Sequence, residues 1–363
     1  MKKTEGLQRG MGIGGWLTNY KRFHVLPQEI RKHITVGDME HFETYITERD
    51  IAYIASLGMD HVRLGFDQIV VEETPFQYRE NIVAILKNFV GWCRAYHLRP
   101  ILNLHKAVGN YCDVIEDVSL MESEELGERF VALWCMLEDT FSGENDVVFE
   151  LLNEVVDPDA EAWNRLAEKT ISAIRAKNKD RLLIVGGIDW NNPSGLDLIK
   201  VYDDENIIYT FHCYAPHEFT HQQGVLKWRP LYYNRKMPYP SEDVERYRDY
   251  QKLYGDPDHY EGLDRIDIEY LRTYLEPAKR FCERHPDKIL WCGEFGTIRH
   301  ADITWRENWM RDMITILKEW DIPYCVWNYL STPNDGNRFS LVDDDSRTIL
   351  SEEMARIIRG DIG

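Results

Sequence analysis

Two glutamates at the ends of apolar segments are the residues of this chain whose surroundings point most clearly to chemistry. Glu154 ends the segment 147–154, and Glu294 lies near the end of the segment 289–296. Each segment is typical of a short buried strand, and burying a carboxylate without a partner is costly. Two such strand ends therefore indicate one site where the fold brings both carboxylates together. Paired carboxylates can cleave a glycosidic bond with retention, one acting as acid/base and the other as nucleophile.

The elements that must position these glutamates alternate between short apolar segments and amphipathic segments with helical spacing. We expect strands at Met11–Leu17, His61–Phe66, Arg99–His105, Val147–Asn153, Leu182–Gly187, Ile207–Tyr214, Ile289–Phe295 and Tyr324–Tyr329. We expect helices near 47–57, 79–96, 124–141, 159–177, 267–284, 304–320 and 348–359. Eight strands that alternate with helices favour an α/β fold, the (β/α)8 TIM barrel, and a doubly wound sheet is the alternative.

The interval 215–266 interrupts this alternation. It is rich in Tyr, Pro, Arg and Asp and has weak apolar periodicity. Long irregular connections are usually functional or disordered, and the many aromatic residues here argue against disorder. We therefore predict one catalytic domain over 1–363, with a small subdomain inserted after the sixth strand. We expect it to form a wall with stacking rings beside the cleft; the alternative is a subdomain that only packs on the outside of a helix.

Composition narrows the possible partners. The net charge of −19 opposes binding to nucleic acid or to anionic membrane surfaces. No segment reaches the roughly 18–20 apolar residues that span a bilayer. The first residues lack the apolar stretch of a secretory signal, so we expect a cytoplasmic protein, or a secreted one whose signal peptide has been removed. The seven cysteines include no CxxC pair and indicate free thiols. We expect a monomer.

Polar or aromatic residues occur where six of the expected strands end: Arg63, His105, Asn153 with Glu154, His212 with Tyr214, Glu294, and Trp327. Active sites of TIM barrels are built at the carboxyl ends of the strands, so these residues predict one site. Each also has a purely structural explanation. Arg63 could form a structural ion pair, Trp327 could belong to the core, Tyr214 could bind a backbone carbonyl, and His105 could only support its neighbours. Weaker candidates for outer sugar subsites are Trp16, Tyr111, Trp190, Asn191, Trp228 and Trp305.

Several segments resemble glycoside hydrolase family 5. Phe149–Pro158 is similar to the acid/base segment of that family, with Asn-Glu at its centre, and Trp291–Gly296 is similar to its nucleophile strand. Gly10–Leu17 and Phe42–Phe66 resemble its first strand, helix and second strand, and Phe211–Tyr214 fits the His-x-Tyr of its sixth strand. The resemblance spans about 10–360 and is strongest to compact clostridial endoglucanases of the cellulase C type.

This resemblance implies a retaining mechanism with Glu294 as nucleophile and Glu154 as acid/base. It further implies that Arg63 keeps Glu294 ionised and that Tyr214 donates a hydrogen bond to it. Asn153 is then expected to bind the sugar 2-hydroxyl, and Trp327 to form the floor beneath the sugar. The two histidines, His105 and His212, are expected to bind hydroxyls or orient the glutamates.

The substrate implied is a β-glucan or cello-oligosaccharide with β-1,4 or mixed β-1,3-1,4 linkages. A β-mannanase, a xyloglucan hydrolase and an exo-β-1,3-glucanase of the same family are alternatives, as is a non-catalytic sugar-binding barrel. No cofactor is expected. We also expect no metal site, because the histidines His212, His217 and His221 lack an acidic ligand at the spacing of known metalloprotease motifs.

Overall fold

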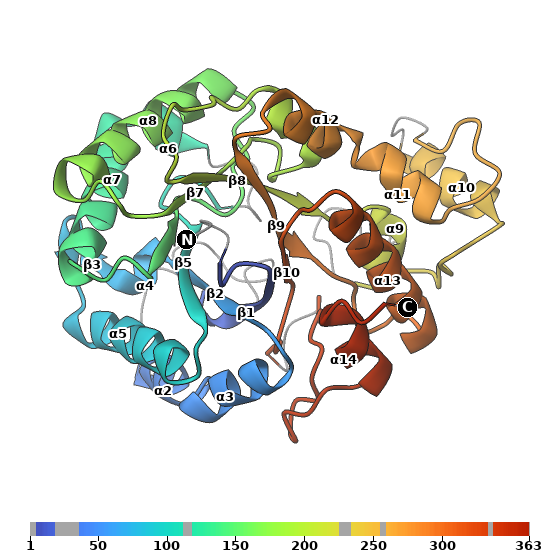
Figure 1. The fold of residues 1–363 in the computed structure, drawn as a ribbon, viewed down its shortest axis with the longest axis horizontal. Coiled ribbons are helices and arrows are strands. Elements are labelled where there is room, and N and C mark those ends of the chain that lie inside the picture. Colours follow the sequence, from blue (N-terminus) through green and yellow to red (C-terminus); the bar gives the residue numbers. More distant parts are fainter. Residues whose placement is uncertain are drawn as a thin grey trace.

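All eight expected strands pair in parallel in one closed barrel in the computed structural model, which describes residues 5–18, 36–111, 118–224, 234–254, 259–332 and 337–362 (Figure 1). The order around the barrel is β1, β10, β9, β8, β7, β6, β5, β2. Their bounds are β1 Arg9–Leu17, β2 His61–Asp67, β5 Arg99–Lys106, β6 Val148–Glu150, β7 Leu183–Gly186, β8 Ile207–Cys213, β9 Ile289–Phe295 and β10 Tyr324–Val326. The predicted (β/α)8 barrel is therefore confirmed, and the doubly wound alternative is wrong.

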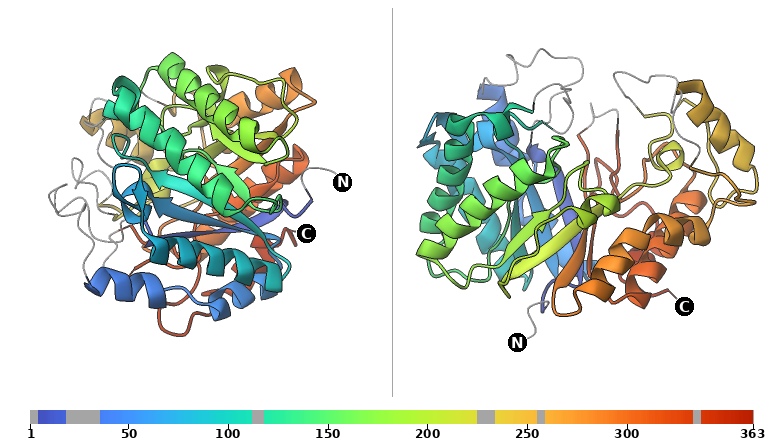
Figure 2. Two further views of the ribbon diagram at one scale, coloured as in Figure 1. Left: turned by 90° about the vertical axis from the view of Figure 1, so that its left-hand side faces the viewer. Right: turned by 90° about the horizontal axis from the view of Figure 1, so that it is seen from above.

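The helices form a layer outside this ring of strands (Figures 1 and 2). Those that follow the predicted amphipathic segments are α3 Glu48–Ser56, α5 Glu80–Ala95, α7 Glu124–Thr140, α8 Ala160–Lys177, α11 Ile268–Tyr274, α12 Glu276–Arg284, α13 Ile303–Glu319 and α14 Glu352–Ile358. The remaining elements are α2 Val36–Thr44, α4 Gln68–Val71, α6 Ser119–Glu122, α9 His217–Thr220, α10 Val244–Tyr254, the 3-10 helix η1 Pro193–Asp197 and a hairpin of β3 Glu72–Thr74 with β4 Gln77–Tyr78.

Several predicted boundaries are wrong, among them the end of the last barrel strand, expected at Tyr329 and observed at Val326. The helix expected over 267–284 is broken at Leu275, because Pro277 has no N–H to donate and is tolerated in the first turn of α12. The last helix begins at Glu352, after the Ser351 hydroxyl caps it by accepting from the Met354 amide, and not at 348. The fourth barrel strand is shorter than expected, so Asn153 and Glu154 lie in the segment that follows it.

The barrel interior changes from apolar to polar along the strands. Near the strand starts, a cluster of inward-facing side chains fills the barrel: Ile101, Val148, Ile184, Ile208, Trp291 and Cys325 with Leu7 and Leu182. Successive side chains alternate between the two faces of a strand, so the residue two positions further along faces the interior again. On four strands that next position is Asn103, Glu150, Thr210 or Trp327. The polar layer therefore rests on an apolar plug.

The described part of the insertion packs on itself and on α13. Tyr260 donates a 2.6 Å hydrogen bond to the buried carboxylate of Glu218, and Tyr239 donates a 2.8 Å bond to Asp312 of α13. Helix α10 lies at the outer edge of the molecule in Figure 1 and in the right-hand view of Figure 2. The aromatic residues Phe219, Tyr239 and Tyr247 are buried, so they are not stacking rings of a cleft wall.

The rest of the insertion leaves the cleft-wall prediction untested. Trp228, Tyr232 and Tyr233 lie outside the described residues, as do the side chains of Tyr250 and Tyr254. The expectation that the insertion borders the cleft therefore stays a prediction for these residues.

Two further observations concern the remaining predictions. The six described cysteines are free thiols, and Cys112 lies outside the described residues. None of the helices in the described ranges is long and apolar enough to cross a membrane.

We predict that the insertion and the barrel unfold as one unit. Tyr239→Phe removes the hydrogen bond to Asp312 and should lower the free energy of unfolding by about 1–2 kcal/mol. The matched control is Tyr247→Phe, which removes a bond to the Pro238 carbonyl inside the insertion. Calorimetry should show one transition that both substitutions move to lower temperature. Two separate transitions, with Tyr247→Phe moving only the smaller, would contradict a single domain.

Candidate active site

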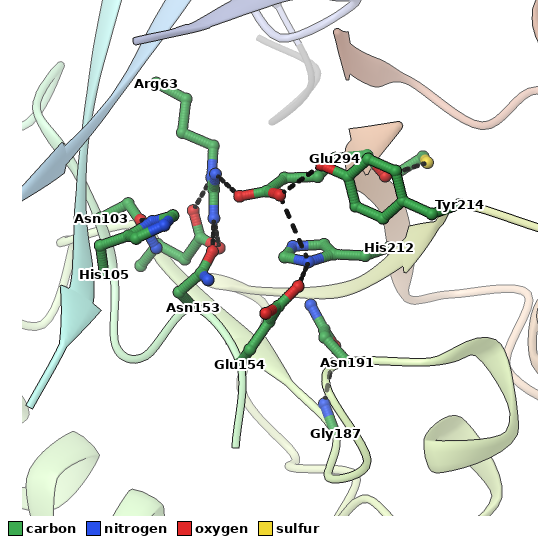
Figure 3. A network of polar contacts seen from close by, with 12 residues as sticks. Arg63, Asn103, His105, Asn153, Glu154, Gly187, Asn191, His212, Tyr214 and Glu294 are labelled. Atoms are coloured by element: carbon green, nitrogen blue, oxygen red, sulfur yellow. Dashed lines mark hydrogen bonds and ion pairs between the residues drawn. The ribbon is translucent and has the colours of Figure 1, made fainter. Parts of the chain in front are cut away.

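The carboxylate of Glu294, on β9, is held by two donors. Arg63 Nη1 on β2 donates to Oε1 at 2.5 Å, and the Tyr214 hydroxyl, just after β8, donates to Oε2 at 2.7 Å (Figure 3). Burial and the neighbouring Glu294 raise the pKa of Tyr214 well above its ordinary value, so the phenol keeps its proton and can donate. Both oxygens of this buried carboxylate are thus hydrogen-bonded.

Arg63 is fully buried and joins three acceptors. Its Nε and Nη2 donate to the two oxygens of Glu150 at 2.6 and 2.8 Å, and Nη2 also donates to Asn153 Oδ1 at 2.6 Å. Burial by itself lowers the pKa of a guanidinium, but the charges of Glu150 and Glu294 outweigh it and raise the pKa of Arg63. The guanidinium is therefore a permanent positive charge at the centre of the site, fixed in orientation by the bidentate pair with Glu150.

Glu154 is bound to a neutral histidine. His212 Nδ1, on β8, lies 2.9 Å from Glu154 Oε1 and 3.8 Å from Glu294 Oε2. Burial lowers the pKa of His212 to about 4, although the nearby Glu294 opposes this shift. His212 is therefore neutral near neutral pH and does not form a strong ion pair with either glutamate. The main-chain amide of His212 donates to the Asn191 carbonyl at 2.7 Å, which fixes the backbone of β8 at the position of His212.

The two carboxylates are close neighbours. One oxygen of Glu154, one oxygen of Glu294 and one ring nitrogen of His212 all lie within 4.8 Å of one another. Among the described residues this is the one group of three acidic, imidazole or thiol side chains close enough to share a metal ion. Both oxygens of Glu294 also accept hydrogen bonds, from a guanidinium and a phenol. Two carboxylates this close can act together on one bond.

Trp327 and His105 form a stacked pair beside this network. Their rings are 5.3 Å apart and within 8° of parallel, and the Arg63 guanidinium lies 5.9 Å from the indole centre. Burial and the charge of Arg63 lower the pKa of His105 well below its ordinary value, so its ring is neutral. A β-carbon on Gly12 or Gly14 of β1 would approach the indole to 2.6 Å, so these glycines leave the space that the Trp327 ring occupies.

Every site residue expected from the sequence belongs to this one end of the barrel, but one partner was missed. Glu150 is fully buried in β6 and makes the bidentate pair with Arg63. A charged residue inside an otherwise apolar strand segment was the available signal. Of the weaker candidates, Trp16 is fully buried against Phe89 and Trp92, so its assignment to an outer subsite is wrong.

Of the other weaker candidates, Asn191 points toward His212 and Glu154 (Figure 3). Its neighbour Trp190 is exposed, and both residues have a positive φ. Trp228 lies outside the described residues.

Comparisons with a family model and with known proteins point to the same family. The family model "Cellulase (glycosyl hydrolase family 5)" matches residues 28–332. Endoglucanase C of Acetivibrio thermocellus is 35% identical over 354 residues, covering 96% of this chain and 97% of that protein. Cellodextrinase A of Ruminococcus flavefaciens is 29% identical over 308 residues, covering 82% of this chain and 78% of that protein.

Solved structures share the fold. A hyperthermophilic endo-β-1,4-glucanase in complex with substrate has a TM-score of 0.73 at 21% identity, covering 99% of this chain and 100% of that one. Thermotoga maritima Cel5A in complex with mannotriose has a TM-score of 0.71 at 22% identity, covering 98% of each chain. The fold and the carboxylate-lined site are those of a barrel enzyme of the glycoside hydrolase class. The chain belongs to glycosyl hydrolase family 5, the cellulase family, which confirms the resemblance drawn from its motifs.

We predict that Glu150 stabilises the protein far more than its neighbour Glu154 does. Glu150→Gln removes the bidentate charge partner of the buried Arg63 and should lower the free energy of unfolding by on the order of 3 kcal/mol. Glu154→Gln is the matched control, because that side chain is 15% exposed and lies beside the neutral His212. Urea unfolding measures both. Equal stability of the two variants would show that the Arg63–Glu150 pair contributes nothing.

Proposed function

We propose that this protein is a retaining endo-β-glucanase that hydrolyses β-1,4 or mixed-linkage β-1,3-1,4 glucan. The observation that carries the proposal is the carboxylate pair within 4.8 Å, in which Glu294 is held by Arg63 and Tyr214. Retaining enzymes place their two carboxyl groups about 5–5.5 Å apart. The similarity over nearly the whole chain to Endoglucanase C of Acetivibrio thermocellus supports the substrate class.

In the first step, Glu294 is the nucleophile. Its ionised oxygen attacks the anomeric carbon, the bond from that carbon to the leaving oxygen breaks, and Glu154 gives its proton to that oxygen. The products are a glycosyl ester on Glu294 and the shortened glucan. Arg63 suits this role for Glu294, because an adjacent cation keeps a carboxylate ionised.

In the second step, Glu154 acts as a base. Its carboxylate takes a proton from a water, the water oxygen attacks the anomeric carbon, and the ester bond to Glu294 breaks. Two inversions at the same carbon retain the anomeric configuration. Tyr214 donates to Glu294 throughout, and this bond strengthens when the carboxylate leaves with its negative charge.

The remaining residues bind the sugar. The Oδ1 atom of Asn153 is held by Arg63, which orients the amide so that its Nδ2 can donate to the 2-hydroxyl. Trp327 supplies an apolar floor under the ring, kept in place by its stack with His105. An exo-β-1,3-glucanase and a β-mannanase are the alternatives within the family, and a sugar-binding barrel without activity is the alternative outside it. The products formed from defined cello-, manno- and laminari-oligosaccharides distinguish all of these.

We expect Glu294→Ala to reduce turnover of cello-oligosaccharides by about 10⁴-fold or more while the protein stays folded. Glu283→Ala, an exposed glutamate on α12, is the control and should have full activity. For the unmodified enzyme, proton NMR during hydrolysis should show the β-anomer as the first product. The α-anomer as first product, or an active Glu294→Ala variant, would overturn the retaining assignment.

We expect Glu154→Ala to reduce kcat/KM strongly on cello-oligosaccharides and little on aryl glycosides whose leaving group needs no proton. Azide should restore turnover of the aryl glycoside by attacking the glycosyl-enzyme, which yields a β-glycosyl azide. The matched control is Glu294→Ala with azide, which reacts in one displacement and should yield the α-azide. Equal losses on both substrates without azide rescue would contradict the acid/base role of Glu154.

A further inference from the structure

Two buried polar atoms in the barrel interior have unmet hydrogen-bonding capacity. They are Thr210 Oγ1 and His212 Nε2, and within the described part of the chain neither has a hydrogen-bond partner. Both residues are on β8, two positions apart, and follow Ile208 of the apolar plug on the same face of the strand. A buried donor or acceptor left unpaired costs about 1–3 kcal/mol, so two such atoms side by side call for an explanation.

Both atoms lie beside the backbone of Gly293. A β-carbon placed on Gly293 would lie 2.6 Å from Thr210 Oγ1 and 3.2 Å from His212 Nε2. The pairing of β8 with β9 shifts register here, because Phe211 pairs with Cys292 while His212 pairs with Glu294. Gly293 is therefore the extra residue of a bulge, and its missing side chain leaves the hydroxyl and the imidazole facing each other. One water bonded to both would span about 5.5 Å, which is enough to join them.

We propose that Thr210 is a positioning residue for the general acid/base. Its hydroxyl donates to one water that in turn donates to His212 Nε2, and so favours the tautomer that carries its proton on Nδ1. The proposal rests on the proposed role of Glu154. A threonine hydroxyl is both donor and acceptor, whereas the neutral imidazole offers one of each, so a donor at Nε2 determines what Nδ1 does.

The tautomer decides where the proton of Glu154 points. His212 Nδ1 lies 2.9 Å from Glu154 Oε1. With the proton on Nδ1, the ring donates to Oε1, and the carboxyl proton stays on Oε2, the oxygen that would protonate the leaving group. With the proton on Nε2, the bare Nδ1 accepts the carboxyl proton instead and turns it away from the substrate. Thr210 therefore supports the arrangement in which Glu154 can act as an acid.

Two carboxylates lie on the Nδ1 side of the ring, Glu154 at 2.9 Å and Glu294 at 3.8 Å, and Thr210 supplies the matching donor on the Nε2 side. The main-chain amide of His212 is fixed by the Asn191 carbonyl at 2.7 Å, so the strand position does not depend on Thr210. The charged or titratable groups around the ring are Glu154 after β6, Glu294 on β9, Arg63 on β2, Glu150 on β6 and His105 on β5. Burial lowers the pKa of His212 to about 4, so the neutral ring carries one proton at working pH and must place it on one nitrogen.

The test compares Thr210→Val, which removes the hydroxyl with little change of shape, with the matched control Thr210→Ser, which keeps it. Nitrogen-15 NMR of the His212 ring should show Nδ1 protonated in the unmodified protein and in Thr210→Ser. In Thr210→Val the population protonated at Nε2 should rise. This readout does not require turnover, and a role in packing alone would leave it unchanged.

Kinetics provide the second readout. In Thr210→Val, kcat/KM on cello-oligosaccharides should fall about tenfold, which is only part of the rate enhancement that a general acid supplies. The kcat/KM on an activated aryl cellobioside should not change. Loss of the Nδ1 donor also favours the protonated form of Glu154, so the alkaline limb of the pH profile of kcat/KM should move to higher pH. Thr210→Ser should match the unmodified enzyme in both respects.

Three results would overturn the proposal. One is protonation of His212 on Nε2 in the unmodified protein, which applies even if Thr210→Val fails to fold. The second is an unchanged tautomer in a folded Thr210→Val variant, and the third is an equal loss on both classes of substrate. An error in the role of Glu154 itself would appear separately, as failed azide rescue with the tautomer of His212 still dependent on Thr210.

Discussion

The guanidinium of Arg63 is the constraint on which the rest of the site depends. It is fully buried at the level where the barrel interior changes from apolar to polar, and it carries a charge that cannot be titrated away. A buried charge is tolerated only when it is paired and hydrogen-bonded. Glu150 and Glu294 supply the countercharges from two other strands, and Asn153 accepts a further bond. One side chain thus fixes the relative positions of β2, β6 and β9.

The pairing also separates two kinds of carboxylate in a small volume. Glu150 is bound through both oxygens to Arg63 and is fully buried, which makes it a structural counterion. Glu294 shares the same guanidinium but keeps its second oxygen for Tyr214. Glu154 lies 2.9 Å from the neutral imidazole of His212. Three glutamates of one sequence acquire different electrostatic surroundings because they sit at different depths of the barrel.

Much of this arrangement could be predicted from the sequence, because the interior of a TIM barrel is read directly from apolar segments and the polar residues that follow them. The prediction of each strand depends on that rule. So does the prediction that Arg63, Tyr214 and Glu294 lie at the same end of the barrel. The rule failed where a polar residue lies within a strand, as with Glu150, since a pattern shows that a charge is present but not what it pairs with. Pro277 was visible, yet the amphipathic pattern on both sides concealed the break between α11 and α12. The insertion resisted prediction because its aromatic residues serve equally well as core or as cleft wall.

The glycines of β1 have a consequence for how this protein could change its substrate. Gly12 and Gly14 let the indole of Trp327, the proposed floor of the sugar site, lie directly on the backbone of the strand. The depth of the floor is then a property of main-chain geometry, which all eight strands determine together. A larger residue at either glycine would push the indole outward and shrink the pocket for every sugar alike. A change of substrate specificity in this chain would therefore come from its loops, while the first strand fixes the position of the Trp327 indole.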